Sequence, residues 1–136
     1  MVNKVTLIGR LGADPEVKYL ETGVAVIRIG LATSENYKGK DGNWVEQTEW
    51  HDVVAWRDLA ERIGKNAKKG HLLYVEGKLT TRTWQDKDGN NRRTTEVVAN
   101  MARSLEKREP NPNAMASHAP IEHAPPPVSD DENLPF

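Results

Sequence analysis

The side chains best suited to binding chemistry in this sequence are three of its four tryptophans. Alternation along residues 47–56 places Trp50 and Trp56 on one face of a predicted strand, and Trp84 falls on the outer face of a second predicted strand. Large aromatics on an outer strand face need a physical reason. Stacking on nucleobases provides one, at about 1–3 kcal/mol for each base. Packing of the same rings beneath a loop, a helix or a second subunit is the alternative.

Lysine and arginine residues accompany these rings on the predicted strands. Lys78 and Arg82 share the outer face of residues 72–84 with Trp84. Cations beside stacking rings would neutralise phosphates and release counterions, which is the electrostatic part of nucleic-acid binding. The candidate phosphate contacts are Lys4, Arg10, Lys38, Lys78, Arg82, Arg92 and Arg93.

Two further aromatic residues, Tyr37 and Trp44, flank a turn at residues 38–43. An aromatic residue on a lysine-bearing hairpin would suit a finger that wraps a nucleic-acid strand. A cross-strand pair that stabilises the hairpin is the other interpretation. It is as good as the first for Tyr37, and the role of Trp44 stays open.

The last seven residues combine three acids with the only phenylalanine of the chain. An apolar anchor behind a cluster of acids resembles a peptide ligand that fills a hydrophobic pocket with a basic rim. An arbitrary frayed end is the alternative. The candidate docking residues are Asp130, Asp131, Glu132, Leu134, Pro135 and Phe136.

Catalytic and metal-binding patterns are missing from the sequence. The chain has no cysteine, and its four histidines form no group with the spacing of metal ligands. No nucleophile–base pairing and no phosphate-cradling glycine loop stands out. We therefore expect a protein that is not an enzyme and holds no metal and no cofactor. Without a signal peptide or a long apolar run, a cytoplasmic location is expected.

The elements that must position these residues are mostly strands. Apolar alternation predicts strands over residues 4–11, 25–33, 47–56, 72–84 and 94–103, with turns at 38–43 and 86–90. A helix is predicted between the third and fourth strands, because Asp58 suits an N-cap with Glu61 three residues on, and Gly70 suits the C′ position. This order is that of the OB fold, an all-β five-stranded barrel with one helix, here with two long hairpin arms.

The same alternation separates core positions from surface positions. In residues 47–56 it places Val54 on the outer face with the tryptophans, and in residues 72–84 it points Leu79 inward. His51 falls on the presumed core side, where a hydrogen-bonded structural role is the first expectation.

Composition divides the chain into three parts. Residues 1–108 hold all 19 Lys and Arg against 15 of the 20 Asp and Glu, a net charge of +4, and form the predicted binding domain. Residues 109–129 are rich in proline and alanine and too polar to build a core, so we expect a disordered linker. Residues 130–136 are the acidic tip described above.

The ordered motifs of the chain resemble those of the bacterial single-stranded DNA-binding proteins. The resemblance covers about residues 1–106 and the tip. The matching stretches are Asn3-Lys4-Val5, Leu11-Gly12, Asp14-Pro15-Glu16-Val17, Leu31-Ala32-Thr33-Ser34-Glu35, Glu46-Gln47-Thr48-Glu49-Trp50-His51, Val75-Glu76-Gly77 and Thr94-Thr95-Glu96-Val97-Val98.

This resemblance implies a sequence-tolerant single-stranded DNA-binding protein with an OB fold, which assembles as a homotetramer and wraps DNA. It implies that His51 takes part in subunit assembly. It also implies a tip that recruits replication, recombination and repair proteins, and a nucleoid-associated location. The implied stacking residues are Tyr37, Trp50, Trp56 and Trp84.

Two strand positions and the C-terminal tip depart from the family pattern. Asp52 stands between Trp50 and Trp56 where a basic residue is common, so this strand is expected to repel phosphate. Thr83 replaces a frequent cation beside Trp84. The chain ends in Asn133-Leu134-Pro135-Phe136, where Asp-Ile-Pro-Phe is typical. An RNA-binding OB module, a nucleic-acid enzyme and a pure interaction scaffold are the rival interpretations.

Overall fold

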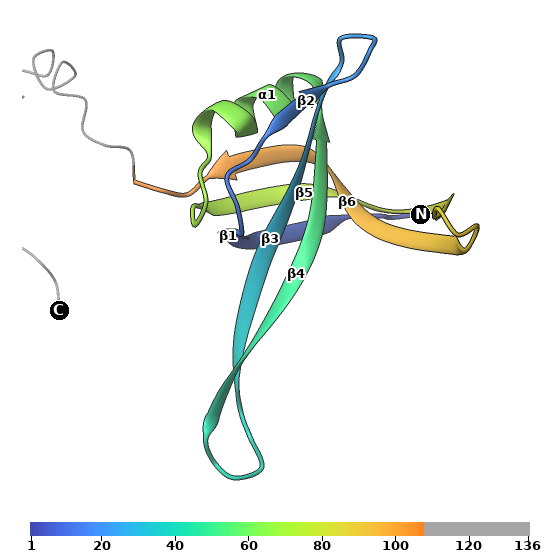
Figure 1. The fold of residues 1–136 in the computed structure, drawn as a ribbon. Coiled ribbons are helices and arrows are strands. Elements are labelled where there is room, and N and C mark those ends of the chain that lie inside the picture. The colour runs from blue at the N-terminus through green and yellow to red at the C-terminus, as the bar shows by residue number, and fades with distance from the viewer. Residues whose placement is uncertain (108–136) are drawn as a thin grey trace, which may run out of the picture. The chain divides into compact units, whose positions relative to one another are not determined.

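The alternating segments form strands that run beyond their apolar patterns. The computed structural model describes residues 1–107 (Figure 1). The strands are β1 Val5–Leu11, β2 Val17–Tyr19, β3 Ala25–Lys38, β4 Trp44–Trp56, β5 Leu72–Gln85 and β6 Asn91–Ser104. In this part of the chain one helix, α1 Arg57–Asn66, joins β4 to β5. The short β2 was not predicted, because three residues are too few to show a period.

Strand β1 closes the sheet into a barrel. It pairs antiparallel with β5 on one side and with the middle of β3 on the other, so the order β1-β5-β6-β4-β3 returns to β1. Strands β4 and β6 are parallel neighbours, paired at Val53–Val97 and Val54–Val98. The predicted OB barrel is confirmed, and β2 adds to the free edge of β3.

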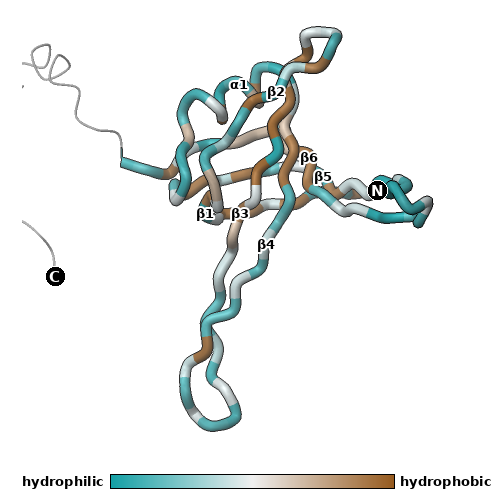
Figure 2. The backbone as a smooth tube through the Cα atoms, viewed as in Figure 1, coloured by the Kyte–Doolittle hydropathy of each residue, from teal (hydrophilic) through white to brown (hydrophobic). Residues whose placement is uncertain are grey.

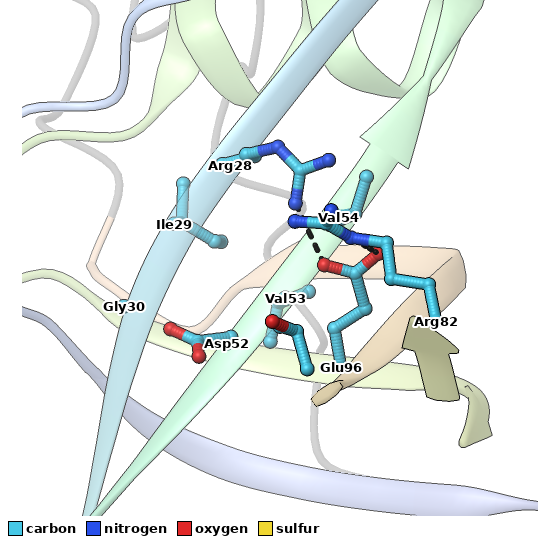
Figure 3. A pocket seen from close by; sticks show the side chains of 9 residues that line it. Arg28, Ile29, Gly30, Asp52, Val53, Val54, Arg82 and Glu96 are labelled. Carbon is cyan, nitrogen blue, oxygen red and sulfur yellow. Dashed lines mark hydrogen bonds and ion pairs between the residues drawn. The ribbon is translucent and has the colours of Figure 1, made fainter. Parts of the chain in front are cut away.

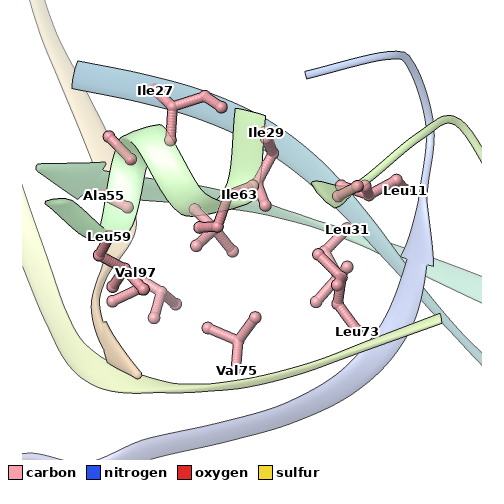
Figure 4. Close-up of a cluster of buried hydrophobic side chains, with 14 of the residues drawn as sticks. Leu11, Ile27, Ile29, Leu31, Ala55, Leu59, Ile63, Leu73, Val75 and Val97 are labelled. Atoms are coloured by element: carbon pink, nitrogen blue, oxygen red, sulfur yellow. The ribbon is translucent and has the colours of Figure 1, made fainter. Parts of the chain in front are cut away.

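The inward faces of the barrel strands form the hydrophobic core (Figure 4). Its largest fully buried members include Ile27, Leu31, Val53 and Val75, each 0–1% exposed. Helix α1 adds Leu59, Ala60 and Ile63 to the same cluster. Figure 2 shows the hydrophobic residues concentrated in the barrel and the hydrophilic ones toward the ends of the hairpins.

Both ends of helix α1 differ from the prediction. Trp56 occupies the N-cap position with extended backbone and no side-chain cap, and Arg57 follows at φ 56°. Asp58 was therefore wrongly predicted as the cap, although its charge in the first turn suits the helix dipole. The helix ends at Asn66 because Ala67 is extended, so Gly70, at φ +84°, serves the next turn instead of C′.

Two side chains have the opposite exposure to the one predicted. Val54 is only 1% exposed although it is on the outer face, because Arg28 and Val98 flank it there on the neighbouring strands. Leu79 was predicted to point into the core but is 48% exposed. Beyond Gly77 strand β5 leaves the barrel, so its inner face has no core to meet.

The two hairpins extend from the barrel as long arms (Figure 1). Their loops use one backbone device, with Gly42 at φ 83° and Gly89 at φ 78°. In the first, the Gly39 amide donates to the Asn43 carbonyl (2.8 Å); in the second, the Asp86 amide donates to that of Asn90 (3.0 Å). Both long arms were predicted from the turn sequences. The helix found among residues 1–107 lacks the length and apolar character of a membrane span.

Candidate nucleic-acid interface

Strand register brings the three tryptophans onto one outer sheet face. Val54 on β4 lies between Arg28 on β3 and Val98 on β6, and Val98 pairs with Lys78 on β5. Even-numbered residues of β3, β4 and β5, and those of β6 up to Val98, therefore share the face that points away from the core. The rings on it are Trp50, Trp56 and Trp84, which are 61%, 40% and 43% exposed.

A floor of glycine backbone supports the ring of Trp50. Gly30 lies two residues before Ala32, the β3 partner of Trp50, and the Gly12 amide donates to the Gly30 carbonyl at 3.1 Å. A Cβ added to Gly12 would meet Trp50 Cζ3 at 2.5 Å, whereas one added to Gly30 would make an ordinary contact at 3.7 Å. The indole therefore packs closely against Gly12 while the residue stays 61% exposed.

A hydrogen bond holds the ring of Trp84. Its Nε1 donates to Thr94 Oγ1 at 2.9 Å across the β5–β6 hairpin. Arg92 is the direct cross-strand partner of Trp84, so a cation stands beside this ring. The indole nitrogen is satisfied within the protein, and the faces of the ring remain for stacking.

Two arginines converge on one buried acid between the hairpins (Figure 3). Glu96 on β6 is 6% exposed. Its Oε2 accepts from Arg28 Nη1 at 2.6 Å, and its Oε1 lies 3.5 Å from Arg82 Nε. Each arginine remains about half exposed, so both are fixed at the surface while their charge is partly neutralised.

These residues line a hollow of about 320 Å³ on the tryptophan-bearing face. Asp52 also lines it, from the position between Trp50 and Trp56. Its cross-strand partner on β3 is Gly30, which offers no side chain to cover it. The hollow therefore holds two acids and two arginines.

The other predicted cations are divided between the tryptophan face and structural contacts. Lys78 is exposed on that face. Lys4 pairs with Glu76 (3.4 Å), Arg92 with Asp86 (3.0 Å), and Arg10 donates to the Gly70 carbonyl (3.0 Å). Arg93 lies on the opposite face of its hairpin, because it pairs with Thr83.

The tip of the β3–β4 hairpin separates its two aromatic residues. Tyr37 pairs with Val45, which puts it on the face opposite to Trp50. Trp44 pairs with Lys38 and lies on the same face as Trp50, with 73% of its surface exposed. Both aromatics are exposed, so the two faces of the arm each carry one.

His51 lies half-buried where the β3–β4 hairpin leaves the barrel. Its Nε2 is 2.8 Å from Thr33 Oγ1 on the neighbouring strand. The side chain thus has the hydrogen-bonded environment that the core-side position predicted. Among residues 1–107, no three His, Asp or Glu side chains gather as metal ligands would.

Hydrogen bonds lower the pKa of three acids around the barrel and arms. The Asn90 backbone amide, helped by Arg92 and the Asp88 amide, lowers the pKa of Asp86. The Asn43 amide lowers the pKa of Asp41 in the same way. On the barrel wall, the Tyr74 hydroxyl donates to Glu76 and lowers the pKa of that carboxyl.

Arg28, Glu96 and Gly12 are parts of this surface that the sequence did not single out. Arg28 had a signal, because it is the one charged residue in an apolar strand pattern. Glu96 likewise interrupts a run of threonine and valine. Gly12 carries no local signal, since its contact with Trp50 depends on the closure of the barrel.

A closed OB barrel that displays indole rings and cations on one outer sheet face defines an OB-fold nucleic-acid-binding protein. Residues 2–105 match the Single-strand binding protein family, and the chain belongs to this family. The family consists of DNA-binding proteins without catalytic activity, so the prediction that the chain is not an enzyme is confirmed.

Curated relatives and solved structures agree with this membership. The chain is 47% identical to single-stranded DNA-binding protein 1 of Xylella fastidiosa over 81% of its length and 82% of the relative. It is 47% identical to the single-stranded DNA-binding protein of Neisseria meningitidis, over 81% of this chain but only 63% of that one.

Two solved structures share the fold. The Plasmodium falciparum SSB in complex with ssDNA superposes with a TM-score of 0.70 at 32% identity, over 78% of this chain and 96% of that one. A deletion mutant of the single-stranded DNA-binding protein from Thermus aquaticus gives 0.68 at 34% identity, over 79% and 52%. The predicted linker and tip, residues 109–136, lie outside the described residues.

Proposed function

We propose that this protein binds and protects single-stranded DNA with little sequence preference, by stacking bases on Trp50, Trp56 and Trp84. The observation that carries the proposal is the sharing of one outer face by three rings that are each 40–61% exposed. Every base has a π face, so such rings bind without reading sequence. The likeness to an SSB solved with ssDNA supports the same conclusion.

The cations on the same face provide the electrostatic part of binding. Lys78 on β5 is in one cross-strand row with Val98 on β6 and Val54 on β4, and Arg92 stands beside Trp84. Arg28 and Arg82 each contribute less than a full positive charge to phosphate binding, because both form ion pairs with Glu96. Phosphates then track the rim of the face while the bases turn toward the rings.

The β3–β4 hairpin extends this path. Tyr37 and Lys38 lie near its tip, and Tyr37 is on the face opposite to Trp50. A strand that reaches both rings must pass over the edge of the arm. We infer that the DNA wraps the hairpin and that Lys38 contacts phosphate on this path.

The acidic tip adds a recruitment function to the proposal. Residues 130–136 present three acids and Phe136 beyond the folded domain. Such a segment suits a hydrophobic pocket with a basic rim on replication, recombination and repair proteins. The protein would then both cover the strand and bring enzymes to it, and we expect it on the nucleoid in the cytoplasm.

Assembly as a homotetramer is part of the same proposal. Ile8 on β1 is 53% exposed and Met101 on β6 is 38% exposed, both on the outer wall of the barrel. Apolar side chains at the surface are suited to contacts between subunits. His51, held against Thr33, would position the base of the hairpin for such contacts. Light scattering with and without oligo-dT measures the mass.

Binding of oligo-dT, followed by tryptophan fluorescence, tests the function. Trp50→Ala and Trp84→Ala should each weaken binding by about 1–3 kcal/mol, or roughly five- to 150-fold, because each removes one stacking platform. Equal-length RNA and duplex DNA should compete poorly, which separates this function from an RNA-binding one. Unchanged affinity in both variants would refute the stacking surface.

Removal of residues 130–136 tests the role of the tip in the same binding assay. It should abolish partner docking and leave oligo-dT binding intact or stronger, since five acids in residues 109–136 then fall to two. If truncation removed DNA binding instead, the division between barrel and tip would be wrong.

A further inference from the structure

The hollow between the tryptophans contains an acid that the phosphate-binding role does not use. Asp52 stands on the same face as Trp50 and Trp56, two residues from one ring and four from the other. An exposed carboxylate at this place repels phosphate. A protein that bound DNA here only through its backbone would gain nothing from it.

The surroundings of Asp52 leave its carboxylate available. Gly30, its partner on β3, has no side chain, so the hollow is open on that side. Arg28 and Arg82 both converge on Glu96 instead (Figure 3). Among the ion pairs formed within residues 1–107, none involves Asp52. Within residues 1–107 its two oxygens have no ion-pair partner, so they are available at the hollow as hydrogen-bond acceptors.

The two arginines offset the negative charge of the hollow, so DNA can approach it. Two acids and two arginines line it, so its net charge is close to zero and the repulsion from Asp52 is local. A base that stacks on Trp50 can hold its edge over the hollow while its phosphates stay at the rim. What reaches Asp52 is then the edge of a base.

Base edges differ in what they offer to a carboxylate. Guanine presents its N1–H and its N2 amino group side by side, which suits two carboxylate oxygens. Cytosine and adenine present one amino group each. Thymine has no amino group, and its single N3–H lies between two carbonyl oxygens that repel a carboxylate.

We propose that Asp52 is a base-edge acceptor that makes this surface favour guanine over thymine. The inference rests on the proposed single-stranded DNA binding and refines it, because stacking still holds every base. Asp52, which departs from the family pattern, would then determine base specificity and not only weaken phosphate binding. One acceptor hydrogen bond is worth about three- to tenfold in affinity for a contacted base.

The test uses short dT oligomers with isolated guanines, and the same oligomers with hypoxanthine in place of guanine. Hypoxanthine keeps N1–H but lacks the N2 amino group, so the pair isolates one donor. The wild-type protein should bind the guanine oligomer about three- to tenfold more tightly than the hypoxanthine oligomer. In Asp52→Asn this ratio should fall to within about twofold, because the charge that strengthens the bond is gone.

Glu49→Gln is the matched control. It removes one negative charge from the same strand, but Glu49 pairs with Thr33 on the opposite face and does not line the hollow. It should keep the guanine preference of the wild type. Thermal unfolding of each variant confirms that the barrel is intact.

Failure of the inference and failure of the proposed function give different results. If the wild type binds oligo-dT and Trp50→Ala weakens it, but the guanine to hypoxanthine ratio is the same in wild type and Asp52→Asn, the base-edge role is overturned. An equal loss of that ratio in Glu49→Gln also overturns it. If the wild type does not bind oligo-dT at all, the proposed function itself fails.

Discussion

The two hairpins begin from the same turn and differ in how their strands are tied together. Residues 40–42 and 87–89 are both Lys-Asp-Gly, and both loops close with matching backbone hydrogen bonds. Beyond the turn, the β5–β6 hairpin carries cross-strand bonds from Trp84 to Thr94 and from Gln85 to Asn91, and an Arg92–Asp86 ion pair.

The β3–β4 hairpin has fewer ties over a comparable length. Its cross-strand side-chain contacts are Ser34 to Thr48 and Thr33 to His51, both nearer to the barrel than to the tip. A turn sequence thus sets the path of a hairpin, whereas the side-chain network sets how firmly a ring is held. Trp84 is fixed by Thr94 on the other strand of its own hairpin, and Trp50 is supported mainly by Gly12, which lies outside β4.

The support beneath Trp50 depends on the lack of a side chain at Gly12. In Gly12→Ala the new methyl group would enter the space of the indole, because a Cβ there would meet Trp50 Cζ3 at 2.5 Å. The ring must lift, and we expect oligo-dT affinity to fall about tenfold through lost stacking. Fluorescence titration measures it.

Gly30→Ala is the control for that change. Its methyl group would touch the same ring at an ordinary 3.7 Å, so affinity should change by about twofold at most. An equal loss of affinity in Gly30→Ala would mean that the close approach of Gly12 is not what positions the ring. Trp84 should be unaffected in both.

Glu96 links the two hairpins, since it holds Arg28 of one and Arg82 of the other. Glu96→Gln should release both cations toward phosphate and strengthen oligo-dT binding at low salt by about two- to fivefold. The slope of log affinity against log salt should steepen by roughly 0.7 for each freed cation. Titrations at several salt concentrations give this slope.

Glu106→Gln provides the charge-matched comparison for Glu96. Glu106 accepts from the Leu72 amide and lies 3.7 Å from a single cation, Arg10, which also donates to the Gly70 carbonyl, so its loss should change the salt slope less than the loss of Glu96. A slope in Glu96→Gln that did not exceed the slope of this control would contradict the neutralising role of Glu96.

The smallest expected effect concerns pH at the hairpin tips. The folded pKa of Asp86 is lowered by the Asn90 amide and then by Arg92, so it lies below the unfolded value of about 3.9. The stabilisation is fully present above that value and is lost as pH falls through the folded pKa. NMR titration of the Asp86 carboxyl measures this pKa.

Asp41 is the internal reference in the other loop. Its pKa is lowered by the amide and side chain of Asn43, without an arginine. Asp86→Asn should abolish the acid dependence of the β5–β6 tip only. A midpoint for Asp86 at or above the ordinary aspartate value would show that these bonds do not hold the loop.

Local patterns were enough to predict the barrel and the faces of the rings. Period-two alternation put Trp50, Trp56 and Trp84 outside, and the two turn sequences gave both hairpins, because these features depend on neighbours along the chain. The prediction of Asp58 as the helix cap was wrong, because the helix already begins at Arg57, which has a positive φ.

Contacts between strands that are far apart along the chain could not be predicted from the sequence. The Arg28–Glu96–Arg82 cluster depends on the parallel pairing of β4 with β6, which no local period reveals. Val54 is buried by side chains from two neighbouring strands for the same reason. The exposure of Leu79 depends on where β5 leaves the barrel, and alternation alone does not mark that point.

The arms are ribbons of two strands, with neither edge supported beyond the barrel. Two-stranded ribbons are marginal in water, so much of their order must come from whatever lies against them. Their outer amides would then exchange with solvent almost freely, while those of the barrel exchange only on unfolding. The barrel would stay rigid, and the two arms would become ordered around a DNA strand as it binds.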